Sequence, residues 1–123
     1  MGYARDRRVL TVKSGPTVSD NVDVAHIIIP ANKEVEVFAF RVLSIVANGT
    51  ASGKMELVKA DNTIIASATN THTASTIADA TQTMPLTVAA STSDTFFKIR
   101  TDQAIDGSGI CHVEVHFAEM GYN

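Results

Sequence analysis

The segment from Gly109 to Ala118 alternates apolar and polar residues almost without a break. Successive side chains leave a strand on opposite faces, so the segment is predicted to be a strand with one face in a hydrophobic core. The apolar set is Cys111, Val113, Val115 and Phe117, and the polar set is His112, Glu114 and His116.

Shorter segments of the same kind, separated by turn residues, follow one another along the rest of the chain. Residues 33–47 carry apolar side chains on both faces, which indicates a strand covered on both sides for much of its length. Asp61-Asn62 is a turn that joins the strands of a predicted hairpin. The predicted core residues are Val35, Val37, Leu43, Leu57, Phe97, Ile99, Val113, Val115 and Phe117.

Residues 66–83 differ from this pattern because they consist mostly of small side chains. Six Thr, two Ser and five Ala make up this stretch, and Ile77 is its one large apolar residue. Such a segment has too little apolar surface for a core of its own. We therefore predict a long surface excursion that includes at most one edge strand.

The short spacing of strands and turns predicts an all-β protein with about seven or eight strands and almost no helix. The predicted fold is a single antiparallel β-sandwich, or jelly-roll-like domain, over residues 22–123. Residues 1–21 are predicted to be an N-terminal arm, because Gly15-Pro16 interrupts the chain after a short apolar run. A length of 123 residues fits one domain with its own core.

Composition favours a protein partner over nucleic acid or a membrane. Charged residues make up 19% of the chain against about 25% in typical proteins, and 45% of residues are hydrophobic. Part of the surface is therefore expected to be covered by a partner. The formal net charge of −3 gives no general attraction to nucleic acid or anionic lipid. The first eight residues have no apolar signal-peptide core, so we expect synthesis in the cytoplasm without export.

The polar face of residues 109–118 holds the strongest candidate for a metal site. Residues two apart on a strand lie about 6.6 Å from one another, so Glu114 could chelate an ion with either neighbouring histidine. His112 and His116 are about 13 Å apart and cannot share one ion. A catalytic zinc site needs three protein ligands, so we expect no metal, no cofactor and a polar face exposed to solvent or a subunit.

Other catalytic and ligand-binding patterns are missing from the sequence. No Ser lies in a Gly-x-Ser-x-Gly turn, and no Gly-rich phosphate loop occurs. Cys111 is predicted to face the core, where a thiolate is costly. The chain has no Trp for a sugar-binding platform. We therefore expect that the protein is not an enzyme and has no catalytic residues.

The predicted arm carries the candidate partner-binding residues. Its arginines suit acidic patches on a protein, and its short apolar run could add a strand to a neighbouring sheet edge. These residues are Arg5, Arg7, Arg8, Val9, Leu10 and Val12.

The order of segments resembles the small β-sandwich decoration or cement proteins of tailed-phage capsids. The stretches that carry the resemblance are Val35 to Val42, Gly53 to Asn62, Pro85 to Val88 with Thr95 to Ile99, and Val113 to Phe117. The resemblance implies a virion protein on the capsid exterior, made in the host cytoplasm, that binds the major capsid protein and copies of itself. By the same analogy a trimer is preferred to a dimer, and there are no catalytic residues to carry over.

Two alternatives stay open from the sequence. One is a tail or head-fibre domain of a virion. The other is a small jelly-roll metal enzyme or ligand-binding domain built around His112, Glu114 and His116.

Overall fold

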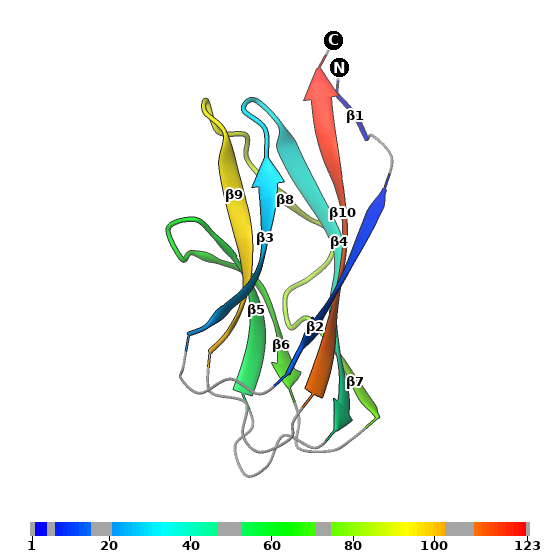
Figure 1. The fold of residues 1–123 in the computed structure, drawn as a ribbon. Helices are drawn as coiled ribbons and strands as arrows, with labels where there is room; N and C mark the ends of the chain where they lie inside the picture. The colour runs from blue at the N-terminus through cyan, green and yellow to red at the C-terminus, as the bar shows by residue number, and fades with distance from the viewer. Residues whose placement is uncertain are drawn as a thin grey trace.

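The computed structural model describes residues 2–4, 7–15, 21–46, 53–70, 75–102 and 110–122. Within them every regular element is a β-strand, which confirms the predicted all-β class. In this part of the chain no helix is long and apolar enough to cross a membrane. The strands form two antiparallel sheets that pack face to face as a sandwich (Figure 1).

The described residues contain ten strands. They are β1 (Gly2–Ala4), β2 (Arg8–Ser14), β3 (Asp23–Ile29), β4 (Glu34–Val46), β5 (Gly53–Lys59), β6 (Ile64–Asn70), β7 (Thr76–Asp79), β8 (Leu86–Val88), β9 (Thr95–Thr101) and β10 (Ile110–Tyr122). One sheet has six strands in the order β1-β10-β4-β7, with β2 also paired to β10 and β8 also paired to β4. The other sheet has four strands in the order β3-β9-β5-β6.

The chain changes sheet at six of the nine connections between successive described strands. It passes from β2 to β3, back to β4 and again to β5, makes the hairpin of β5 and β6, and returns through β7 and β8 to β9 and finally β10. Two interleaved sheets wound in this way form a jelly roll. The predicted jelly-roll-like sandwich is therefore the observed architecture.

The hairpin of β5 and β6 turns where the sequence predicts it. Lys59 donates its amide to the Thr63 carbonyl at 2.9 Å, and Asn62 lies in the left-handed region with φ of 71°. Hydrogen bonds from the Thr63 side chain and amide hold the pKa of Asp61 below its usual value. The turn is thus fixed by local polar contacts.

The core lies between the sheets, and all predicted core residues except Leu43 are buried. A β-bulge explains the exception. Val37 pairs with Phe117 and Ala39 pairs with His116, so that Phe38 between them has no partner on β10.

The bulge reverses the alternation of β4 beyond Phe38. Phe40 and Val42, which a continuous alternation places on the outer face, are 1% and 0% exposed in the core. Leu43, predicted to be buried, lies on the outer face and is only partly covered. The prediction for Leu43 was wrong because one extra residue moves every following side chain to the opposite face.

Residues 66–83 also differ from the predicted surface excursion. Their first part forms β6, in which Ala66 and Ala68 are fully buried. This strand packs against β4 of the opposite sheet, and small side chains allow the two backbones to approach. The low apolar content therefore reflects close packing at this end of the four-stranded sheet. The later part includes β7, a short strand at the edge of the six-stranded sheet.

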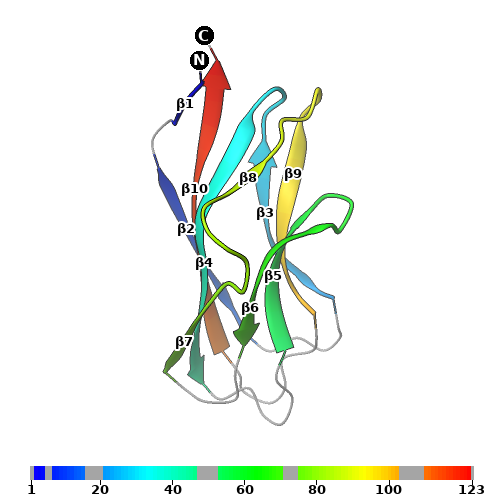
Figure 2. The ribbon, with the colours of Figure 1, turned by 180° about the vertical axis from the view of Figure 1, so that it is seen from behind.

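A connecting segment closes the side of the sandwich next to β6. Ala80 donates its amide to the Phe40 carbonyl of β4, and Thr81 donates its amide to the Ser67 carbonyl of β6, at 2.9 and 3.0 Å. Gln82 accepts a hydrogen bond from the Ser67 amide at 2.8 Å. Figure 2 shows this segment, between β7 and β8, running between the two sheets. We call residues 80–82 the strap.

Residues 8–14, which the sequence assigns to the arm, form β2 and pair with β10 along their whole length. Leu10 and Val12 are partly buried against the core of their own chain. This segment is therefore ordered within the sheet, in contrast to an arm that orders only on a partner. The boundary at residue 21 between arm and domain stays a prediction.

Candidate functional site

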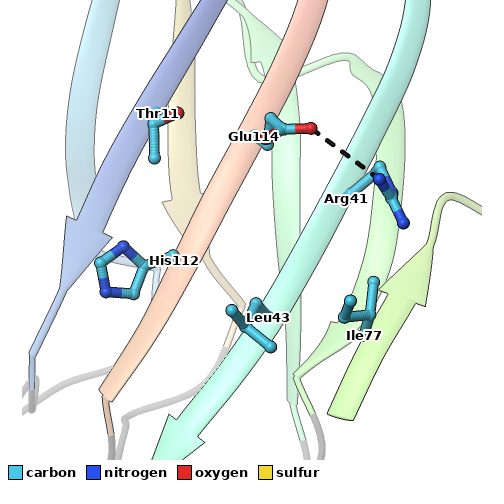
Figure 3. A pocket seen from close by; sticks show the side chains of 6 residues that line it. All are labelled: Thr11, Arg41, Leu43, Ile77, His112 and Glu114. Carbon is cyan, nitrogen blue, oxygen red and sulfur yellow. Dashed lines mark ion pairs between the residues drawn. The ribbon is translucent and has the colours of Figure 1, made fainter. Parts of the chain in front are cut away.

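The outer face of the six-stranded sheet holds a shallow depression of about 290 Å³. It is lined by side chains from four strands, β2, β10, β4 and β7, as Figure 3 shows. These side chains are Thr11, Arg41, Leu43, Ile77, His112 and Glu114. The depression therefore includes two of the three residues that the sequence identifies as the candidate metal site.

Strand register explains why these side chains meet. One row across the sheet contains Thr11, Glu114, Arg41 and Asp79. The next row contains Lys13, His112, Leu43 and Ile77. The bulge at Phe38 turns Arg41 and Leu43 outward, so the depression depends on the same feature that changes the core.

A chain of polar contacts runs from His116 into the first row and along it to Asp79. His116 Nε2 lies 2.6 Å from Glu114 Oε1, which is 4.0 Å from Arg41 Nη1. Arg41 Nε then donates a hydrogen bond of 2.9 Å to Asp79 Oδ1. The Asp79 side chain is 76% exposed and that of Arg41 is 43% exposed, so solvent screens the chain. Exposed pairs of this kind contribute about 0–1 kcal/mol each.

The candidate metal ligands do not converge on one point. Glu114 contacts His116, whereas His112 lines the depression on the other side of Glu114. The two other histidines of the chain, His26 and His72, are further candidate ligands from the sequence. His26 lies on the outer face of the other sheet, beside Phe96. His72 is outside the described residues. Among the residues that the structure describes, no three His, Cys, Asp or Glu side chains form a group that could hold a metal ion.

Cys111 is buried in the core at the start of β10. Burial raises the pKa of its thiol to about 11. The thiol is therefore protonated at neutral pH, and a nucleophilic thiolate is disfavoured. This position agrees with the inward orientation that the alternation of β10 predicts.

The predicted partner-binding residues have contacts within the chain. The guanidinium of Arg7 lies 3.7 Å from the centre of the Phe38 ring, a cation–π contact. Arg8 Nη2 lies 3.6 Å from Glu119 Oε2, although the Arg8 side chain is 59% exposed. Val9 is exposed, whereas Leu10 and Val12 pack against the core. Arg5 is outside the described residues. The role of this set in binding a partner stays a prediction.

A second surface feature lies on the outer face of the four-stranded sheet. Ile28 of β3 pairs in register with Phe96 of β9, and these side chains are 77% and 39% exposed. The ring of His26 lies beside that of Phe96, with centroids 5.8 Å apart. Sequence reasoning did not identify Ile28. The run Ile27-Ile28-Ile29 could have revealed it, because three consecutive apolar residues on a strand place at least one side chain on the face away from the core.

No protein-family model matches the chain, and no curated protein matches it. Among solved structures, the chain is similar to one in the structure of infectious bursal disease virus, Gt strain, with 17% sequence identity and a TM-score of 0.43. The match covers 97% of this chain, which spans 34% of the length of that chain.

Proposed function

We propose that the protein is a structural virion protein that binds and stabilises an assembled phage capsid as a decoration or cement protein. Jelly rolls serve as viral capsid domains, as lectins and as cupins, so the fold admits this role without selecting it. The choice between these classes depends on the surface.

The observation that carries the proposal is the exposure of large apolar side chains on both outer faces of the sandwich. Ile77 and Val9 on one face are each 56% exposed, and Ile28 on the other is 77% exposed. Burial of such side chains against a partner is favourable by about 25 cal/mol for each Å² removed from water. A protein that covers a capsid surface has a use for apolar positions on more than one side.

The polar residues of the depression support a binding role more than a catalytic one. Arg41 is engaged by Asp79 and Glu114, and Glu114 is engaged by His116. Each of these contacts is exposed and contributes little, so a charged side chain of a partner could replace one of them at little cost. In this proposal the exposed Arg8 and Val9 of β2 contribute to the same contact area, and the protein is not an enzyme.

A ligand-binding role is the second candidate, and the 2.6 Å contact between His116 and Glu114 favours it. A pair of this kind can orient an imidazole for binding or proton transfer. The pair lies beside the depression, whose floor includes the apolar Leu43 and Ile77.

Co-sedimentation with capsids tests the proposal. Purified protein is mixed with capsids assembled from the major capsid protein encoded in the same genome, and the bound amount is measured over a concentration series. We expect saturable binding at a fixed ratio to the capsid protein. The charge-introducing variant Ile77→Asp tests the outer face of the six-stranded sheet, with Thr92→Asp, at an exposed position between β8 and β9, as its control. No binding by the unaltered protein would contradict the proposal.

A further inference from the structure

Strand β3 is the least protected edge of the sandwich. It has seven residues, and within the described residues it pairs with β9 on one side only. From Val24 to Ile29 it carries no Asp, Glu, Lys or Arg. An edge strand of this kind offers unpaired backbone groups to another strand.

The other edges have the features that usually prevent such pairing. β1, β7 and β8 have three, four and three residues, too short for a long ladder. β2 carries Arg8 and Lys13, and charged side chains on an edge oppose association. The opposite edge of the same sheet, β6, is occupied at Ser67 by hydrogen bonds from and to the strap.

We propose that β3 pairs with β3 of a second copy of this chain, antiparallel and across a two-fold axis, so that two four-stranded sheets become one. This contact gives a structure to the self-association that the resemblance to decoration proteins implies, with two copies in place of the trimer expected from that analogy. It does not require capsid binding. An isologous contact of this type closes with two copies.

The register follows from what limits β3 at each end. The pairing of β3 with β9 is irregular between Asp23 and Ala25, and Pro30 follows the strand and has no amide to donate. The regular stretch is therefore Ala25 to Ile29, and its centre is Ile27. Antiparallel pairing about this centre places Ile27 opposite Ile27 of the second copy and His26 opposite the second copy's Ile28.

The side chains of that register suit a second copy of the same strand. On the outer face, Ile28 of each copy would pack against His26 and Phe96 of the other copy. By symmetry both copies bury the same exposed apolar surface, which is favourable. On the inner face, Ile27 is partly buried against the core and would meet its own counterpart. The stretch contains no charge that would be buried without a partner.

Charged groups at the two ends of β3 do not oppose the contact. Asp23 Oδ2 lies 3.8 Å from Lys98 Nζ at one end, and at the other Asp94 Oδ1 accepts a hydrogen bond of 2.8 Å from the Ala31 amide, near Lys33. Each end therefore holds both an acidic and a basic group. The antiparallel sense follows from the two-fold axis, which runs two copies of one edge strand in opposite directions.

The solution mass tests the contact without capsids. Sedimentation equilibrium is measured over a concentration series for the unaltered protein, Ile28→Lys and Ile64→Lys. Ile64 is the matched control, since it is 49% exposed on β6 at the opposite edge of the same sheet. Thermal melting of each variant establishes that it is folded. We expect twice the chain mass of 13.1 kDa for the unaltered protein and for Ile64→Lys, and the single chain mass for Ile28→Lys.

Cysteine cross-linking tests the register. Opposed residues of antiparallel strands have Cα atoms about 4.5–5.5 Å apart, which a disulfide can span. An equal mixture of His26→Cys and Ile28→Cys chains is expected to form a covalent dimer on mild oxidation, whereas neither chain alone does so. The buried Cys111 is present in every sample and acts as an internal control.

Three results would overturn the proposal. The first is a single-chain mass for the unaltered protein at the highest concentration, even if Ile28→Lys loses capsid binding, because β3 would then contact the capsid rather than a second copy. The second is a trimer mass for the unaltered protein, because the two-fold contact closes with two copies. The third is efficient cross-linking of Ile28→Cys alone, which excludes the register centred on Ile27.

Discussion

Strands β10 and β4 are neighbours of equal length, but alternation along the sequence predicts the buried face correctly throughout only in β10. Each has 13 residues, and they lie side by side in the six-stranded sheet. In β10 the inner row from Cys111 to Phe117 keeps a strict alternation, and every member is buried. In β4 the alternation breaks at Phe38, and the residues beyond it change faces.

The difference shows how a bulge creates a surface site as well as a core. Without the extra residue, Arg41 would face inward, where an unpaired charge is expensive. With it, Phe40 and Val42 complete the core, and Arg41 reaches Asp79 and Glu114 on the outer face. Substitutions on the inner face of these strands should therefore cost far more stability than substitutions on the outer face.

Val115→Asp is expected to have the largest effect. Val115 is 1% exposed at the centre of the inner row of β10, so the substitution buries an unpaired carboxylate. The cost is several kcal/mol, on the order of the whole stability of a small domain. Thermal or urea unfolding measures it, and His112→Asp on the outer row of the same strand is the control. A folded Val115→Asp protein with an unchanged melting temperature would show that the inner row has been misassigned.

Phe40→Ala and Leu43→Ala test the bulge in β4. Phe40 is 1% exposed, and its truncation is expected to cost about 3–5 kcal/mol in the free energy of unfolding. Leu43 is partly covered on the outer face, so its truncation should cost less than half as much. Urea unfolding of both variants compares the two. If the alternation of β4 were unbroken, Leu43→Ala would cost more stability than Phe40→Ala, and that result would refute the bulge.

The buried thiol of Cys111 should make stability fall at alkaline pH. The pKa in the folded protein is about 11, against 9.0 for an ordinary thiol, so above pH 9 the unfolded chain binds fewer protons than the folded one. Stability is therefore lost as pH rises through this window, by at most about 1.4 kcal/mol per pH unit. Urea unfolding between pH 8 and 11 is compared with Cys111→Ala. Identical slopes for the two proteins would mean that the thiol is not shielded from water.

The double variant His112→Ala, His116→Ala is expected to have the smallest effect. Both side chains lie on the outer row of β10, and the contact of His116 with Glu114 is partly exposed, so the loss should stay under about 1 kcal/mol. Elemental analysis is made on both proteins after expression in medium supplemented with zinc and iron. We expect no stoichiometric ion in either. An ion held by the unaltered protein and lost in the double variant would favour the ligand-binding alternative.

Sequence alone predicts the strands well and the outer site poorly, for physical reasons. The alternation of β10 fixes its phase because polar residues separate the apolar ones. In Phe38-Ala39-Phe40 all side chains are apolar, so the sequence does not reveal where the phase changes. Likewise, the burial of Ala66 and Ala68 follows from how closely β6 approaches β4, which composition does not record.

The site itself depends on pairings between distant parts of the chain. Arg41 meets Asp79 through the register of β4 with β7, a strand that lies in the stretch of small residues. The outward position of Ile28 follows from the register of β3 with β9. Local pattern identified the polar row of β10, and tertiary pairing supplied its neighbours.

Quantitative mass spectrometry of purified virus particles tests the capsid-binding proposal most directly. The number of copies of this chain is measured relative to the major capsid protein in particles that have been washed at high salt. The proposal predicts a fixed ratio set by the capsid lattice. Absence of the chain from the particles, or a few copies per particle as for a tail or fibre component, would contradict it.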